Sequence, residues 1–167
     1  PYEDVKPTVV DTDSVGYTMV TGGSRTTFAT GWAAILAAEN VIEQMVERAA
    51  QIWETSSNDV QYKDGVISHV SDPELRMTFK ELARQINSTG GSITGTASLD
   101  PSGEGNSFGV HIVDVVVDPD TGKTEVLRYT AIQDAGKAVH PSYVEGQMQG
   151  GVVQGIGWAL NEEYVYN

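Results

Sequence analysis

Residues 28–53 read FATGWAAILAAENVIEQMVERAAQIW. Apolar side chains recur in this stretch mostly at steps of three and four residues. The charged residues that fall between them are Glu39, Glu43, Glu47 and Arg48. This spacing is typical of an amphipathic helix with 3.6 residues per turn, so we predict a helix of about six to seven turns.

The loop before this helix, residues 21–26, reads TGGSRT. Free backbone N–H groups, hydroxyls and the positive end of the helix dipole converge at a helix N-terminus, so an anion is the natural ligand of such a loop. The alternative is an ordinary capped loop, in which Thr26, Thr27 or Thr30 supplies the cap. The residues alone leave both interpretations open.

The rest of the chain predicts strands and a second helix. Asp64-Gly65 between two short apolar runs predicts a β-hairpin, and Thr78-x-x-Glu81 has the spacing of a capping box that begins a short helix. Residues 108–117 and 126–132 predict two antiparallel strands, and residues 118–122 predict the turn between them. The fold class that follows is α+β, a single domain with a mostly antiparallel sheet packed with a long amphipathic helix and a Gly-rich second helix.

The second helix is expected from Pro141 to about Leu160. Glycine weakens a helix by roughly 0.5–1 kcal/mol relative to alanine, so five glycines suggest that something approaches its backbone closely. Among them stand three amide side chains, Gln147, Gln149 and Gln154. Amides donate and accept, which suits a heterocycle with several polar edge atoms; close helix packing is the alternative.

The composition excludes several classes of function. Ten Lys and Arg against 23 Asp and Glu give a net charge of −13, which would repel a nucleic-acid backbone. Because the chain has no cysteine, these residues hold neither a disulfide nor a cysteine-ligated cluster. The sequence shows no membrane-spanning apolar run, and residues 1–12 carry no basic region followed by an apolar one, so we expect a soluble, unprocessed chain. A cytoplasmic location is the default expectation, and a periplasmic one is not excluded.

Several segments come close to known motifs but depart from them. Gly122-Lys123-Thr124 lacks the first glycine of a phosphate-binding loop, and the turn 118–122 departs from a calcium loop. His69, His111 and His140 lack the close spacing of a metal site, so no metal ligand is predicted. Ser24 comes close to a nucleophile elbow, but Thr26 stands at its second glycine.

Four motifs together resemble the large, molybdopterin-binding subunit of molybdenum hydroxylases of the xanthine dehydrogenase and aldehyde oxidase type. They are residues 11–13 (DTD), 21–27 (TGGSRTT), 133–136 with 140–141 (QDAG and HP), and 145–158 with 162–163 (EGQMQGGVVQGIGW and EE). They follow the order of that family and span nearly the whole chain. The resemblance implies that residues 1–167 are a fragment of that subunit's molybdopterin-binding domain.

The resemblance also implies the cofactor and the residues that contact it. The loop Thr21, Gly22, Gly23, Ser24, Arg25 and Thr26 matches the family loop that wraps the pterin and phosphate of molybdopterin. Gln147 matches a family glutamine whose amide contacts the cofactor near its metal end. Arg25 stands where several relatives have a small residue.

The implied reaction is an oxidative hydroxylation of N-heterocycles or aldehydes, in which water supplies the oxygen. The implied partners are the remainder of the large subunit and iron–sulfur and FAD subunits or domains. The family's general base is a glutamate in a segment after Asn167, so no catalytic residue is assigned here. We therefore expect the isolated chain to be inactive, to lack the cofactor and to self-associate through exposed surface around Trp32, Trp53 or Trp158. The alternatives are a non-catalytic interaction domain without cofactor and a serine hydrolase centred on Ser24.

Overall fold

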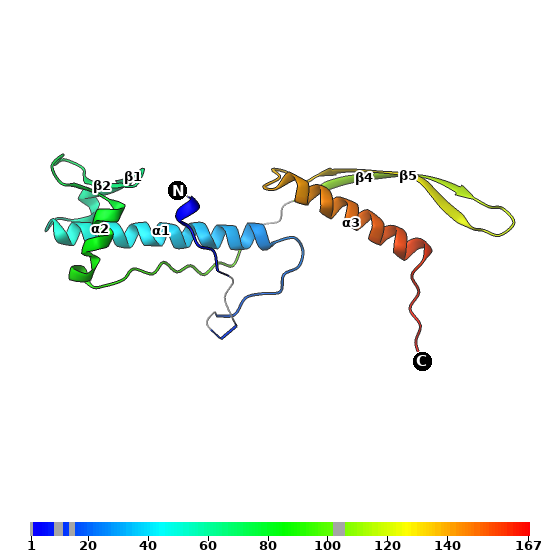
Figure 1. The fold of residues 1–167 in the computed structure, drawn as a ribbon, viewed down its shortest axis with the longest axis horizontal. Coiled ribbons are helices and arrows are strands. Elements are labelled where there is room, and N and C mark those ends of the chain that lie inside the picture. Colours follow the sequence, from blue (N-terminus) through cyan, green and yellow to red (C-terminus); the bar gives the residue numbers. More distant parts are fainter. Residues whose placement is uncertain (1, 9–11, 14–15, 102–105) are drawn as a thin grey trace. The chain divides into compact units, whose positions relative to one another are not determined.

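A computed structural model describes residues 2–8, 12–13, 16–101 and 106–167 of the chain. The chain forms two compact units, residues 1–102 and 103–167 (Figure 1). Both units contain helix and antiparallel sheet, which confirms the α+β class. Because two compact units can belong to one larger domain, the single-domain assignment stays a prediction.

The first unit is built on α1, Thr26–Ile52, which confirms the predicted long helix. Its C-terminal half packs against a three-stranded antiparallel sheet in the order β1 (Val60–Lys63), β2 (Val66–His69) and β3 (Arg76–Thr78). The short helix α2, Phe79–Gln85, closes the layer, and Ile86–Thr89 form a 3-10 turn after it. Two further 3-10 turns are Tyr2–Asp4 and Ser57–Asp59.

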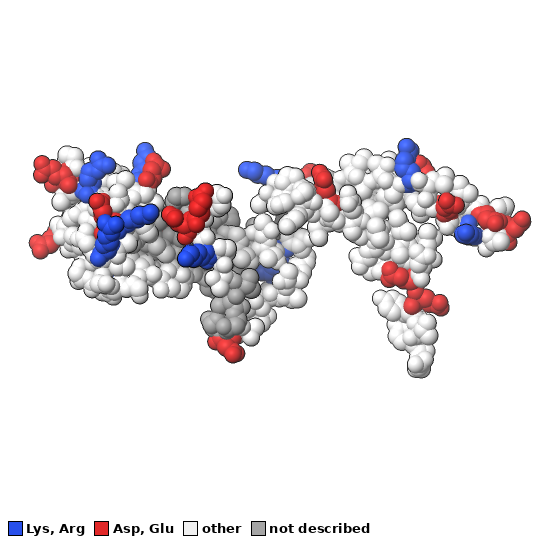
Figure 2. All heavy atoms as spheres, viewed as in Figure 1, with Lys and Arg blue, Asp and Glu red and all other residues white. Residues whose placement is uncertain are grey.

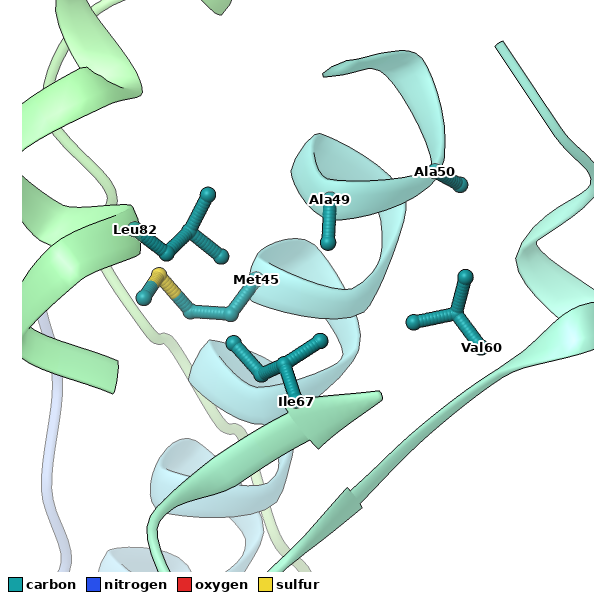
Figure 3. Packing of buried hydrophobic residues seen from close by; sticks show 6 residues of the cluster. All are labelled: Met45, Ala49, Ala50, Val60, Ile67 and Leu82. Atoms are coloured by element: carbon teal, nitrogen blue, oxygen red, sulfur yellow. The ribbon is translucent and has the colours of Figure 1, made fainter. Parts of the chain in front are cut away.

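The core of this unit is small and lies where α1, the sheet and α2 meet (Figure 3). Its buried side chains are Met45, Ala49, Ala50, Val60, Ile67 and Leu82. Ile67 and Leu82 are fully buried, at 0% exposure, and point toward Met45 from β2 and α2. The helix therefore holds the sheet through one apolar stripe near its C-terminal end.

Local sequence explains the turns of this unit. Asp64 and Gly65 have φ angles of 49° and 81°, as the predicted two-residue hairpin requires, and Lys63 pairs with Val66. The capping box is also confirmed, since Thr78 N donates to Glu81 Oε2 at 2.7 Å and Glu81 N donates to Thr78 Oγ1 at 3.2 Å. The third strand was not predicted, because three residues are too short to show alternation.

After α2 the chain returns along α1. Gln44 Nε2 donates to the carbonyl oxygen of Thr94 at 3.0 Å, and Thr96 N donates to Asn40 Oδ1 at 3.4 Å. A side chain at Gly95 would collide with the backbone carbonyl of Ala37. The middle of α1 is therefore covered by an extended segment rather than by a helix or strand.

The second unit is a long hairpin and a helix. The strands β4, Phe108–Val117, and β5, Thr124–Asp134, are antiparallel, with an irregularity between Asp114 and Val115. They confirm the predicted strand pair, and β5 extends two residues beyond the predicted range at each end. Helix α3, Pro141–Leu160, follows β5 and contacts it. None of the described residues of this unit is buried.

The two long helices differ in how their apolar residues are interrupted. Charged residues separate the apolar residues of α1, and glycines and amide side chains separate those of α3. Within the described part of the chain, no helix combines the length and the apolar character needed to cross a membrane.

Candidate functional site

The predicted cofactor loop forms a left-handed turn directly before α1. Gly23 and Ser24 have φ angles of 66° and 56°, and Arg25 follows in the right-handed region at φ −90° and ψ −12°. A left-handed residue followed by a right-handed one turns successive N–H groups toward one side, which creates an anion-binding concavity. Serine adopts a positive φ only rarely, so this turn is an unusual backbone feature at the predicted site.

The donors of this loop remain available to a ligand. Arg25 is the N-cap of α1, and its side chain makes no capping hydrogen bond. The first intrahelical bond runs from Ala29 N to the carbonyl oxygen of Arg25, at 2.7 Å, so the N–H groups of the first turn lack helix partners. Residues 21–24 and Thr26 are exposed, and no atom lies within 4 Å of a Cβ built at Gly22 or Gly23.

Arg25 is the half-buried member of this loop. Its Nη1 atom donates to the thioether sulfur of Met19 at 3.3 Å. A thioether is a weak acceptor, so this contact orients the guanidinium without neutralising its charge. The loop therefore combines a positive side chain with backbone N–H groups that lack helix partners.

Gln147 lies in the second unit, on the exposed surface of α3. The helix begins at Pro141, and the ring of His140 stacks on Tyr143 with centroids 3.9 Å apart. No described atom lies within 4 Å of a Cβ built at four of its glycines: Gly146, Gly150, Gly151 and Gly155. At the fifth, Gly157, a Cβ would meet the carboxylate of Glu162. A close approach to the other four glycines stays a prediction.

A hollow of about 530 Å³ lies between β5 and α3, and no local sequence pattern predicts it. Tyr129, Gln133, Glu145, Met148 and Gln149 are among its lining residues. Gln147 is not, because residues two apart on a helix point in nearly opposite directions. The alternation of residues along β5 and the helical spacing along α3 show which residues share a face of each element. The sequence does not show which of these faces meet, so it does not predict the hollow.

The segments that come close to calcium-binding, metal-binding and nucleophile-elbow motifs do not form such sites in the described residues. The side chain of Asp118 accepts hydrogen bonds from Asp120 N at 2.8 Å and Thr121 N at 3.2 Å, which lower the pKa of its carboxyl group. This confirms a solvated hairpin turn. No three His, Cys, Asp or Glu side chains gather as a metal site within the described residues. Residues 16–20 form no strand, so the strand of a nucleophile elbow before Ser24 is missing.

The whole chain matches one protein family and is similar to large subunits of known enzymes. The family described as the molybdopterin cofactor-binding domain matches residues 1–167. The chain is 30% identical to the nicotine 6-hydroxylase large subunit of Paenarthrobacter nicotinovorans, over 100% of this chain and 21% of that subunit. It is also 30% identical to the xanthine dehydrogenase molybdenum-binding subunit of Escherichia coli O157:H7, over 99% of this chain and 23% of that subunit.

The chain is also similar to a part of a solved structure. Reconstituted CO dehydrogenase from Oligotropha carboxidovorans superposes with a TM-score of 0.64 and 28% identity, over 93% of this chain and 20% of that one. The chain thus spans about a fifth of the length of the curated relatives and solved structures that it matches.

Proposed function

Because the chain belongs to the molybdopterin cofactor-binding domain family, we propose that it forms part of the large subunit of a molybdenum hydroxylase. The proposed reaction is the oxidative hydroxylation of an N-heterocycle or an aldehyde. The observation that carries the proposal is the left-handed Gly23–Ser24 turn in front of α1, at the loop that the resemblance assigns to the cofactor. The match of the family over residues 1–167 supports it independently.

The donors present in the loop fit a pterin that carries a phosphate. Ser24 and Thr26 are exposed, and their hydroxyls together with the backbone N–H groups after Gly23 suit phosphate oxygens. The positive end of the α1 dipole favours a negative group there, and Arg25 adds a full charge. When bound, the cofactor supplies the two-electron oxidation chemistry that the side chains of this chain lack. The role of the loop is to bind and orient.

Gln147 is proposed to contact the same cofactor through its side-chain amide. The support is the family match of its segment, its exposure on α3 and the open backbone at Gly146 and Gly150. An amide both donates and accepts, so it can pair with a polar atom in either protonation state.

The remaining elements of the proposal concern the complete protein. Its partners are proposed to be the rest of the large subunit together with iron–sulfur and FAD subunits or domains. The general base is proposed to be a glutamate outside these 167 residues, so the chain by itself is expected to have no hydroxylase activity. A cytoplasmic location stays a prediction.

Elemental and pterin analysis of the complete protein tests this function. We expect molybdenum and pterin in comparable molar amounts, together with oxidation of aldehydes or N-heterocycles that incorporates oxygen from isotopically labelled water. A folded protein that takes up neither molybdenum nor pterin, even when produced in cells that assemble the cofactor, would contradict the proposal. That result would favour the non-catalytic interaction domain.

A further inference from the structure

The three-stranded sheet of the first unit has one face on α1 and one open face. Val60, Tyr62 and Ile67 alternate toward the core. The other residues form what we term the outer face: Gln61, Lys63, Val66, Ser68, Arg76 and Thr78. The register places Ser68 between Gln61 and Arg76, since it pairs with both.

The outer face is hollowed rather than flat. A depression of about 420 Å³ lies over it, bordered by the loop that joins β2 to β3. Its polar floor is formed by Gln61 and Ser68, which are joined by a hydrogen bond from Gln61 Nε2 to Ser68 Oγ of 3.4 Å. Val66, Val70 and Pro73 add apolar patches to the lining, and Val70 is 62% exposed.

Two cations line this depression without a carboxylate partner. Lys63 and Arg76 make no salt bridge within the described residues, whereas Arg128 pairs with Asp114 and Lys80 with Asp4. Asp64 is the acidic residue of the lining. Figure 2 shows lysine and arginine side chains exposed at the end of the first unit that holds β1 and β2, with carboxylates between them. Most lysines and arginines of the described residues make no salt bridge, so what distinguishes Lys63 and Arg76 is that both line the same depression.

We propose that the outer face docks an acidic peptide segment of a partner protein, with carboxylates of the segment on Lys63 and Arg76. The charge of the lining is complementary to such a segment, and the amide and hydroxyl on the floor suit an extended backbone. The apolar patches beside the cations favour a peptide over a bare anion.

The test uses the complete protein and a short fluorescent peptide of alternating Glu and Val, followed by fluorescence anisotropy. The double variant Lys63→Glu/Arg76→Glu is compared with Lys80→Glu/Arg84→Glu, which makes the same charge change on exposed residues of α2. We expect roughly a tenfold loss of affinity in the first variant and little change in the second. Melting curves of both variants verify that the sheet remains folded.

Several outcomes would overturn the proposal. Equal losses in both variants would mean that the peptide responds to overall charge, and no binding by the folded wild-type protein would mean that the face is not a docking site. Displacement of the peptide by inorganic phosphate at a concentration equal to that of the peptide would identify a small-anion site. Tighter binding of a DNA oligonucleotide than of the peptide would identify the wrong class of partner.

Discussion

Gly95 lies against the backbone carbonyl of Ala37, so the segment that returns from α2 touches α1 at its main chain. A Cβ at position 95 would meet that carbonyl and would also come within 2.6 Å of Val41 Cγ2. We expect Gly95→Ala to lower the free energy of unfolding by about 1–3 kcal/mol, because overpacking forces the segment away from the helix. Chemical denaturation monitored by circular dichroism measures the change.

Gly16→Ala is the matched control for this prediction. Gly16 also lies outside the helices and strands, and nothing lies within 4 Å of a Cβ built there. Its substitution should leave stability unchanged or slightly raised, because alanine restricts the unfolded chain. Equal stability of the two variants would show that the segment around Gly95 does not pack on α1 as described.

The capping box of α2 predicts a dependence of stability on pH. Hydrogen bonds from the backbone N–H and hydroxyl of Thr78 hold the pKa of Glu81 below its ordinary value of 4.5. A group whose pKa is lowered by folding stabilises the protein above its unfolded pKa, and this contribution is lost as the pH falls through the folded pKa. The wild-type protein should therefore exceed Glu81→Gln in melting temperature at neutral pH, and the difference should shrink as the pH drops below about 4.5.

Glu47→Gln removes the same charge from an exposed position on α1 and serves as the control. The difference in melting temperature between the wild-type protein and Glu47→Gln should not shrink in the same way over this pH range. A difference between wild type and Glu81→Gln that stays constant from neutral to acidic pH would argue against the capping role.

Gln147 separates a cofactor contact from simple helix packing. In the complete protein, Gln147→Ala should lower turnover or molybdenum content, since an unpaired buried polar group costs roughly 1–3 kcal/mol. If Gln147 is only a polar residue of α3, alanine is the better helix former and the melting temperature should rise slightly. Gln51→Ala, at an exposed position of α1, is the matched control. Unchanged turnover with a raised melting temperature would remove Gln147 from the site.

The second unit predicts the behaviour of the 167-residue chain on its own. None of its described residues is buried, and its exposed large apolar side chains include Phe108, Ile112, Val116 and Trp158. Apolar patches of more than a few hundred Å² usually find a partner, so the isolated chain should self-associate and show no hydroxylase turnover. Light scattering at increasing concentration and an aldehyde oxidation assay measure both. A strictly monomeric chain would count against the first expectation, and turnover with bound molybdenum against the second.

The local elements were predictable from sequence because their signals are short in range. The spacing along α1, the Asp64-Gly65 turn and the Thr78–Glu81 box each fix a structure within a few residues. The return segment at Gly95 and the hollow between β5 and α3 depend on contacts between residues far apart in the chain. No local pattern encodes such contacts.

The candidate site was predictable in part. The motif and the helix N-terminus pointed to residues 21–26, but the left-handed angle of Ser24 and the contact of Arg25 with Met19 could not be foreseen. Of the three tryptophans expected at the surface, Trp32 and Trp158 are 53% and 66% exposed. Trp53 instead packs partly against the core, because it directly follows the helix face that holds the sheet.

The cofactor content of a Ser24→Asp variant tests the proposed role of the loop most directly. Aspartate tolerates a positive φ, so the turn should persist, while its carboxylate opposes a phosphate in front of α1 at a cost of several kcal/mol. We predict that the complete protein with Ser24→Asp retains its melting temperature in the cofactor-free form but loses more than about nine-tenths of its molybdenum and pterin. Ser98→Asp, at an exposed position after α2, should keep both. Full molybdenum and pterin content in Ser24→Asp would contradict the assignment of residues 21–26 to the cofactor.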